Sequence, residues 1–337
     1  MANSAQNELA VLLEAAGVAP ITDSAFLRVT GADAARWLNG MVSNSIQSLQ
    51  PGEGCYNFLL NAQGRILGDC TVYRETSEEP AEFLLATTTA QVEAIQQHLD
   101  HFIIMDDVEL TRAYVEASGL LIVGKDAAAV MGRVGLPAVD PLRLVHADTE
   151  HGPVLLLSSV AGLTPRYELR ATTAAVDGLR GAMGLSEVSA ETLEALRLME
   201  ARPLFGQDIR NTEKAHDLPQ ETAQAHALHF AKGCYLGQEI VERIRSRGQV
   251  HRQFMAFRLT GELPATLPVP LEAAGKPAGE LTSAALVPLP EGPTMLALGY
   301  ARLEALPIGS ASGQADKPEL TYPGGVAVPH RIPQPTV

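Results

Sequence analysis

The 337-residue sequence has few cysteines, few aromatic residues and no long apolar run. Its three cysteines, Cys55, Cys70 and Cys234, lack CxxC spacing and are too few for a disulfide scaffold, which is typical of a reducing compartment. No uninterrupted apolar stretch approaches the roughly 18 residues of a membrane-spanning helix. The N-terminal stretch lacks a basic n-region and carries Glu8 and Glu14, so it predicts an amphipathic helix and no signal peptide. We therefore predict a cytoplasmic protein with no membrane partner.

Positive charge is also scarce: the sequence has 25 Lys and Arg residues against 39 Asp and Glu residues, which gives a formal net charge of −14. This balance excludes a protein whose whole surface binds nucleic acid or an anionic membrane. With 46% hydrophobic and 19% charged residues, the composition is that of a globular chain. At roughly 150 residues per domain, the length predicts two or three domains.

Hydrophobic periodicity predicts an α+β fold with two mixed lobes. In the first lobe, β-rich runs over residues 55–61 and 65–74 are joined by the hairpin turn Ala62-Gln63-Gly64. A helix is expected over 92–102 and a further strand over 103–110. The second lobe alternates in the same way, with strands at 120–123, 154–157 and 167–171 and helices at 127–134, 176–183 and from Ser189 onward.

The C-terminal part of the chain has a different composition. Thirteen of the 22 prolines lie between Pro264 and Pro335, and they separate short apolar runs such as Met295–Tyr300. This pattern predicts a small β-barrel, with a partly ordered Pro-rich tail as the alternative. The predicted domains are residues 1–115, 116–250 and 251–337.

The densest chemical signal is the octapeptide Lys232-Gly233-Cys234-Tyr235-Leu236-Gly237-Gln238-Glu239. Its two glycines permit unusual φ values and close approach of backbone to a ligand. Lys232 lies two residues before Cys234, and a nearby ammonium favours the nucleophilic thiolate. The alternative is a Gly-bounded turn in which Cys234 is buried as a small hydrophobic residue.

A basic stretch follows the octapeptide and reverses the charge of the chain. This stretch contains only two acidic residues, Glu239 and Glu242, but five basic residues: Lys232, Arg243, Arg245, Arg247 and Arg252. Guanidinium groups pair with carboxylates and phosphates, so the stretch favours an anionic ligand. The alternatives are a solvated helix face with internal ion pairs, and RNA contact without the aromatic residues of a stacking platform.

Two histidine pairs, His98 with His101 and His226 with His229, have i, i+3 spacing. Without a third nearby ligand they give only a weak indication of a metal site. The sequence contains no GxSxG, P-loop, HExxH or GxGxxG motif.

The octapeptide resembles the signature of the YgfZ family of folate-binding proteins, relatives of the aminomethyltransferase (T-protein) of the glycine cleavage system. The resemblance extends over several further segments: Trp37-Leu38-Asn39-Gly40 with Asn44, Tyr56, Asn61–Arg65, Leu196–Leu198, Arg202–Gly206 and Leu218–Glu221. It implies two α+β lobes that form a folate-binding module around a central cavity, followed by a C-terminal β-barrel. It also implies tetrahydrofolate or a reduced derivative as ligand.

The family implies functional residues. Cys234 would be the functional thiol and would supply at most one ligand to an iron–sulfur cluster, with no other metal ligand predicted. Asp69 would act in catalysis only in a transferase. The predicted folate-binding residues are Tyr56, Asp69, Glu200, Lys232, Gly233, Tyr235, Gly237, Gln238, Glu239 and Arg243.

The sequence departs from the aminomethyltransferase pattern at three places. One acid of a pair is absent, since Gly68 precedes Asp69; the pterin-binding acid falls one place late, at Glu200; and Gln238 replaces a basic residue. The alternatives are a solvent-facing strand residue for Asp69, a core aromatic for Tyr56 and an exposed helix-end carboxylate for Glu200.

Three functions remain in competition. The leading hypothesis is a tetrahydrofolate-binding accessory factor for making or repairing iron–sulfur proteins, including those that modify tRNA, so that its partners are folate and iron–sulfur client or assembly proteins. The second is a folate-dependent aminomethyl or methyl transferase, or a demethylase. The third is direct tRNA binding through the basic stretch, with an affinity that falls steeply with salt.

Overall fold

The computed structural model describes residues 2–213, 215–248, 250–289, 291–306 and 319–330. They form two compact units, each assembled from separate stretches of chain. One unit comprises residues 10–189 and 226–238 and contains both mixed lobes, while the described residues of 2–9, 190–225 and 239–330 form the other. None of the helices in these described ranges is long and apolar enough to cross a membrane.

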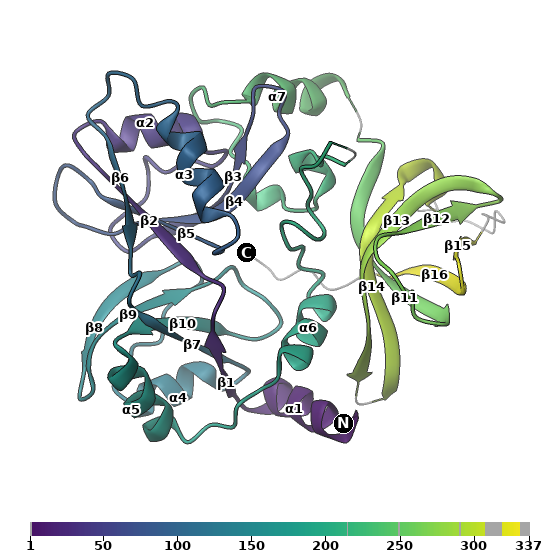
Figure 1. Cartoon of the computed structure of the whole chain (residues 1–337), viewed down its shortest axis with the longest axis horizontal. Helices are drawn as coiled ribbons and strands as arrows, with labels where there is room; N and C mark the ends of the chain where they lie inside the picture. The colour runs from purple at the N-terminus through teal and green to yellow at the C-terminus, as the bar shows by residue number, and fades with distance from the viewer. Residues whose placement is uncertain (1, 214, 249, 290, 307–318, 331–337) are drawn as a thin grey trace. The chain divides into compact units, whose positions relative to one another are not determined.

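The first lobe is an antiparallel sheet of strand order β3-β4-β5-β2-β6 with two helices against it (Figure 1). Its side chains alternate between buried and partly exposed along β4, as expected for a strand with one face in a core. The elements are β2 (Ala25–Thr30), α2 (Ala34–Met41), β3 (Gly54–Leu60), β4 (Ile66–Arg74), β5 (Phe83–Thr87), α3 (Val92–Asp100) and β6 (Glu109–Ala113).

The predicted hairpin is confirmed, because β3 and β4 pair across the turn that follows Leu60. The Asn61 side chain accepts hydrogen bonds from the backbone N–H groups of Gln63 and Arg65, both at 3.0 Å. Gly64 has φ +70°, a left-handed conformation that a glycine adopts without steric cost. Local turn chemistry therefore fixes the register of this hairpin.

The strand predicted over residues 103–110 is wrong over residues 103–108, since β6 begins only at Glu109. The preceding residues form a turn that is tied to the start of α2. Asp106 accepts a hydrogen bond from Arg36 at 2.6 Å, and the backbone N–H of Asp107 donates to Asp33 at 2.9 Å. These side-chain bonds compete with strand pairing, as short acidic side chains do at turns.

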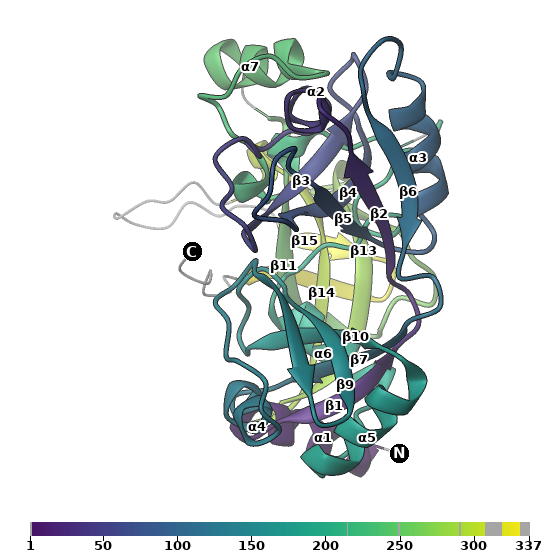
Figure 2. The same ribbon diagram turned by 90° about the vertical axis from the view of Figure 1, so that its left-hand side faces the viewer.

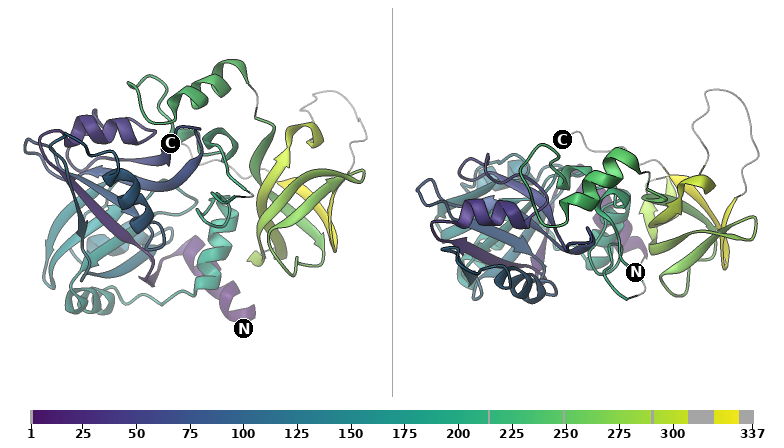
Figure 3. Two further views of the ribbon diagram at one scale, coloured as in Figure 1. Left: turned by 45° about the horizontal axis from the view of Figure 1, so that its top comes forward. Right: turned by 90° about the horizontal axis from the view of Figure 1, so that it is seen from above.

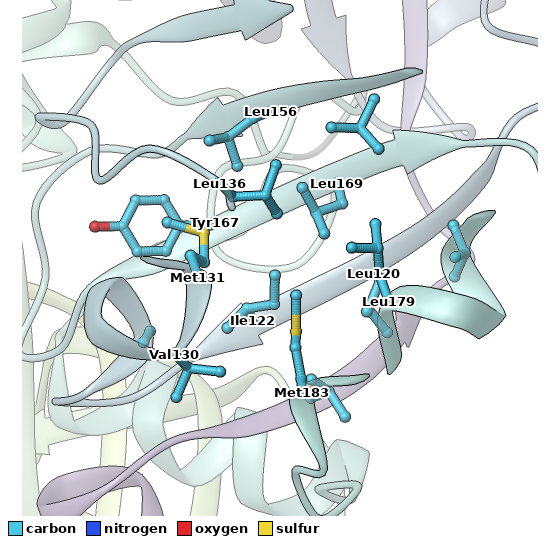
Figure 4. Close-up of a cluster of buried hydrophobic side chains, with 14 of the residues drawn as sticks. Leu120, Ile122, Val130, Met131, Leu136, Leu156, Tyr167, Leu169, Leu179 and Met183 are labelled. Atoms are coloured by element: carbon cyan, nitrogen blue, oxygen red, sulfur yellow. The ribbon is translucent and has the colours of Figure 1, made fainter. Parts of the chain in front are cut away.

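The second lobe is an antiparallel sheet of order β1-β7-β10-β9-β8. Leucines and other apolar side chains from its strands pack against helices on one face and form a buried cluster (Figure 4). The sequence did not predict β1, which carries Pro20; as an edge strand, it tolerates the missing N–H. The elements are β1 (Gly17–Ile21), β7 (Ser118–Val123), α4 (Ala127–Arg133), β8 (Leu144–Thr149), β9 (Gly152–Ser158), β10 (Arg166–Ala171) and α5 (Thr173–Met183).

The two sheets of this unit also pack on each other. Phe26 and Tyr73 from the first sheet share a buried cluster with Leu155 and Leu157 from the second. The Tyr73 hydroxyl donates to the backbone oxygen of Ser158 at 2.9 Å, so the buried polar group is paired. Figure 2 shows the two sheets from the side.

The second unit contains a closed barrel of order β11-β14-β13-β12-β15-β16 (Figure 3). This barrel confirms the prediction for the C-terminal part, although residues 307–318 and 331–337 of that part lie outside the described residues. Its strands are β11 (Arg252–Gly261), β12 (Val269–Ala273), β13 (Lys276–Leu289), β14 (Gly292–Arg302), β15 (Leu320–Tyr322) and β16 (Gly325–His330).

The remaining helical elements lie at the start of the chain, on either side of the octapeptide, and after β14 in the barrel. Helix α7 contains three residues of the basic stretch, Arg243, Arg245 and Arg247, whereas Lys232 precedes the helix and Arg252 begins β11. The elements are α1 (Ala2–Glu14), α6 (Ala190–Met199), α7 (Gln238–Arg247) and the 3₁₀ turns η1 (Pro219–Glu221), η2 (Ala225–Ala227) and η3 (Leu303–Ala305).

Candidate functional site

Two of the predicted ligand-binding residues meet on neighbouring strands of the first sheet. Tyr56 on β3 pairs with Thr71 on β4, so Asp69 lies diagonally opposite it on the same face. The Tyr56 hydroxyl donates to Asp69 Oδ2 at 2.6 Å. Asp69 is thus held by a defined partner, and it is not the solvent-facing strand residue of the alternative interpretation.

Gln91, at the start of α3, completes this arrangement. Its Nε2 donates to Asp69 Oδ1 at 2.9 Å, while its Oε1 accepts from the Asp69 backbone N–H at 3.0 Å. A Cβ added at Gly68 would lie only 3.1 Å from Gln91 Oε1. The Gln91 side chain therefore uses the space beside the position where the aminomethyltransferase pattern has its second acid.

Asp69 has an environment that favours its neutral form. Burial raises the pKa of this carboxyl above its ordinary value, and the hydrogen bonds from Tyr56 and Gln91 counter part of that rise. A carboxylate accepts up to about four hydrogen bonds, and these two side chains supply two. Asp69 therefore retains capacity for further donors or for a proton.

A second aromatic ring, that of His226, contacts Tyr56, and no signal in the sequence predicts this contact. The His226 ring lies 5.4 Å from the Tyr56 ring, with an angle of 37° between their planes. Burial lowers the pKa of His226, so the imidazole is neutral at pH 7. Asn44 Nδ2 donates to the His226 backbone oxygen at 2.8 Å and fixes this segment.

Lys232 anchors the octapeptide. Its Nζ donates to the backbone oxygens of Asn39, Val42 and Asn44 at 2.7, 2.7 and 2.6 Å. These oxygens lie at the C-terminal end of α2 and just beyond it, where the helix dipole favours a cation. Burial lowers the pKa of Lys232 to about 8, so it remains mainly an ammonium at pH 7.

This geometry differs from the expected activation of Cys234 by Lys232. An ammonium has three N–H groups, and the three carbonyl oxygens use all of them. The Lys232 charge also lies 5.0 Å from the centre of the buried Tyr235 ring. Lys232 therefore acts first as a clamp between the octapeptide and α2.

Gly237 provides the second contact of the octapeptide, with the β3–β4 turn. Gly237 has φ +82°, and a Cβ there would lie 2.5 Å from the backbone oxygen of Asn61. The neighbouring Leu236 N–H donates to the Gly40 oxygen at 3.0 Å. Only Gly237 meets the expected need for glycine, because Gly233 has no positive φ and open space around it.

Cys234 is the exposed cysteine of the three. Burial raises the pKa of Cys55 to about 11 and that of Cys70 well above its ordinary value, so both thiols are protonated at neutral pH. Cys70 packs in the core of the first lobe. The described residues contain no group of three or more His, Cys, Asp or Glu side chains that fits a metal ion.

The remaining predicted residues lie in α7, except Glu200, which directly follows α6. Gln238 Oε1 accepts a hydrogen bond from the Tyr235 N–H at 3.3 Å. Glu239, in the first turn of α7, and Arg243 are exposed. Glu200, whose side chain is 6% exposed, pairs with Arg202 at 3.4 Å, so it is not an exposed helix-end carboxylate.

Arg252 does not project freely toward an external anion. It forms ion pairs with Asp217 at 2.6 Å, Glu221 at 3.0 Å and Glu280 at 3.4 Å. On α7, Arg245 pairs with Glu242 at 3.5 Å. The alternative of internal ion pairs therefore describes these two arginines. The roles predicted for Glu200, Glu239 and Arg243 toward folate, and the central cavity, stay predictions.

Comparison with known proteins relates the chain to two groups. Residues 1–147 match the family model described as the GCVT N-terminal domain. The chain is 26% identical over 253 residues to the mitochondrial iron-sulfur cluster assembly factor IBA57 homolog of Pyricularia oryzae. It is 27% identical over 298 residues to the aminomethyltransferase of Synechococcus sp., covering 86% of this chain and 80% of that protein.

The match to the Pyricularia protein covers 71% of this chain but only 57% of that longer relative. Among solved structures, the glycine cleavage system aminomethyltransferase T from Bartonella henselae superposes with a TM-score of 0.79 at 19% identity, covering 96% of this chain and 87% of the other. This likeness confirms the predicted fold class. Residues 1–147 therefore resemble the GCVT N-terminal domain, and the chain as a whole is distantly similar to IBA57 homologues and aminomethyltransferases.

Proposed function

We propose that the protein is a tetrahydrofolate-binding accessory factor in the maturation or repair of iron–sulfur proteins. The observation that carries the proposal is the Tyr56–Asp69–Gln91 cluster, in which a partly buried carboxylate has unused acceptor capacity. The cluster lies in the same unit as the clamped loop that exposes Cys234. The similarity to an iron-sulfur cluster assembly factor, at 26% identity, supports this assignment.

The side chains of the Tyr56–Asp69–Gln91 cluster fit the pterin head group of a folate. A pterin presents an edge of N–H donors, which a carboxylate such as Asp69 accepts, and its flat ring suits neighbouring aromatic side chains such as Tyr56. Tetrahydrofolate, when bound, supplies a carrier for one-carbon units. Its glutamate tail carries carboxylates, for which guanidinium groups are the usual partners.

Cys234 is proposed as the functional thiol. As a solvent-exposed side chain on an anchored loop, it is accessible to a partner protein without unfolding. Cys55 is half-buried, Cys70 is buried, and both thiols are protonated, so this chain offers Cys234 as a single sulfur ligand, and a cluster needs further ligands from a client or assembly protein. Support of tRNA modification is then indirect, through iron–sulfur enzymes.

Calorimetry with 5-formyltetrahydrofolate tests the ligand. We expect the wild type to bind and Asp69→Asn to bind at least about tenfold more weakly, because an amide cannot supply the same acceptor pair. Asp177→Asn, an exposed position on α5, is the matched control and binds as the wild type does. Absence of binding by the wild type contradicts the proposal.

The thiol is tested in cells that lack the protein, with the activity of an iron–sulfur enzyme as the reporter. Cys234→Ala is expected to lose complementation while it folds and binds folate normally. Cys55→Ala is the control, because its thiol is half-buried and donates to the Ser45 oxygen. Full complementation by Cys234→Ala removes the accessory-factor proposal.

A folate-dependent transferase is the second candidate, favoured by the match to aminomethyltransferases over most of their length. The raised pKa of Asp69 suits a group that takes up or gives a proton at a reacting amine. This candidate requires turnover of a one-carbon donor with tetrahydrofolate that Asp69→Asn abolishes. Binding without turnover leaves the accessory factor as the function.

A further inference from the structure

A cavity of about 400 Å³ lies at the sheet of the second lobe, and none of the predicted folate-binding residues lines it. Its walls come from the turn between β6 and β7, from β8 and β9, and from the end of β10. We call it the β8–β10 pocket. The volume is within the range of small-molecule sites, and the proposed function does not use it. The residues that line it include Tyr114, Glu116, His146, Asp148, Leu155 and Arg170.

The floor of the pocket is fixed by strand register. Leu155 on β9 pairs with His146 on β8 and with Arg170 on β10, so these three side chains share one face of the sheet. The strands lie side by side in Figure 1. Leu155 belongs to the buried cluster between the two sheets, which gives the pocket a rigid apolar floor.

Tyr114 forms an aromatic wall in a strained conformation. Its φ is +55°, an outlier for a bulky residue that costs about 1–2 kcal/mol. Its hydroxyl donates a hydrogen bond to Glu75 Oε1 at 2.8 Å, and Phe26 packs edge-on at 5.7 Å between ring centres. Such strain persists only where the surrounding structure holds it, and it is found most often at binding sites.

The charges deep in and beside the pocket are already paired. The Glu75 carboxylate accepts hydrogen bonds from Arg28 Nε at 2.8 Å and Arg28 Nη2 at 2.9 Å. His146 Nε2 lies 3.4 Å from Glu75 Oε1. Burial alone would raise the pKa of Glu75, but hydrogen bonds from His146, Arg28 and Tyr114 lower it to about 2. Arg170, whose side chain is 6% exposed, donates through Nε to Glu168 at 2.6 Å, while its Nη2 is buried and has no hydrogen-bond partner among the described residues.

Two carboxylates at the pocket have no such partner. Glu116 and Asp148 are exposed, and neither takes part in an ion pair or hydrogen bond within the described part of the chain. With Arg170 neutralised by Glu168, the uncompensated charge of the pocket is negative. An anionic ligand is therefore repelled, whereas a cation gains two acceptors.

We propose that the β8–β10 pocket binds a small organic ammonium with an apolar body. The apolar part lies on Leu155 against the Tyr114 ring, and the ammonium lies between the carboxylates of Glu116 and Asp148. The net charge of −14 attracts cations to the protein as a whole and increases their rate of encounter.

Three probes of nearly equal size test the proposal: 2-phenylethylammonium, 2-phenylethanol and phenylacetate. Chemical-shift titration of the wild type is expected to give a dissociation constant for the ammonium about fivefold or more below that of the alcohol, with phenylacetate weaker still. High salt reduces the preference for the ammonium, because the two carboxylates are exposed. Equal binding of the three probes, or binding of none, overturns the proposal.

Variants locate the site. The double variant Glu116→Gln with Asp148→Asn is expected to lose the preference for the ammonium while its thermal midpoint is unchanged, since both side chains are exposed and unpaired. Glu150→Gln, an exposed acid in the adjoining β8–β9 turn that does not line the pocket, is the control and keeps it. Retention of the preference by the double variant overturns the proposal, whatever the outcome for folate.

Discussion

The clamp formed by Lys232 allows a quantitative prediction for the variant Lys232→Met. Methionine keeps the length and apolar stem of lysine but leaves three backbone carbonyls without their donor. At about 1 kcal/mol net for each hydrogen bond, the variant is expected to lose about 3 kcal/mol of the free energy that holds the octapeptide on α2. At 1.36 kcal/mol per factor of ten, this corresponds to a roughly 150-fold larger opening equilibrium.

Hydrogen exchange measures this opening directly. The backbone N–H groups of His229 and Leu236 donate to the oxygens of Ser43 and Gly40 at 3.2 and 3.0 Å, so they are protected while the segment is docked. In Lys232→Met we expect their exchange to accelerate by roughly two orders of magnitude, with much smaller changes in the barrel unit.

Lys125 offers a matched control for the same substitution. Its side chain is 60% exposed and lies 3.2 Å from Glu14, which is 77% exposed. Such a surface pair contributes about 0.5 kcal/mol or less, so Lys125→Met is expected to leave the protection of residues 226–238 unchanged. Equal protection in the two variants would refute the clamp.

Three further predictions concern glycine, aspartate and arginine. Gly237→Ala is expected to destabilise the protein by about 2 kcal/mol or more, measured by urea unfolding, because of its φ and the backbone oxygen at 2.5 Å, whereas Gly233→Ala is nearly neutral. Because the pKa of Asp69 is raised on folding, the folded protein binds this proton more tightly, so wild-type stability falls as pH rises from about 4 through the folded pKa. Asp69→Asn should remove that fall, and identical pH profiles would contradict it. Arg252→Met leaves the carboxylates of Asp217 and Glu221 without their cation, while Glu280 keeps its pair with Arg210, and the variant is expected to lower the unfolding free energy by about 3 kcal/mol. The exposed Arg302→Met is expected to change it little.

Local signals in the sequence predicted those elements whose formation depends on near neighbours. The β3–β4 hairpin follows from its turn residues, and helices α3 and α5 follow from apolar residues at helical spacing. The barrel follows from short apolar runs between prolines. The failure at residues 103–108 has the opposite cause, because Asp106 and Asp107 bond to residues about 70 positions earlier.

The candidate site was predicted in part. Tyr56 and Asp69 were named from a resemblance, and the register of two adjacent strands brings them into contact. Gln91 carried no signal of its own, since a glutamine at the start of a helix is ordinary until a carboxylate is placed beside it. His226 was noted for its spacing to another histidine, but its contact is with an aromatic ring on β3.

The sequence alone determined that this is an acidic α+β chain with a C-terminal barrel and one distinctive octapeptide, because composition, periodicity and contiguous motifs are local properties. Tertiary structure decided what that octapeptide does. It assigns Lys232 to carbonyls about 190 residues earlier and leaves Cys234 exposed. It also pairs Arg252 internally and leaves two acids unpaired beside the strained Tyr114. Charge and reactivity depend on which groups burial brings together, and chain order does not specify that.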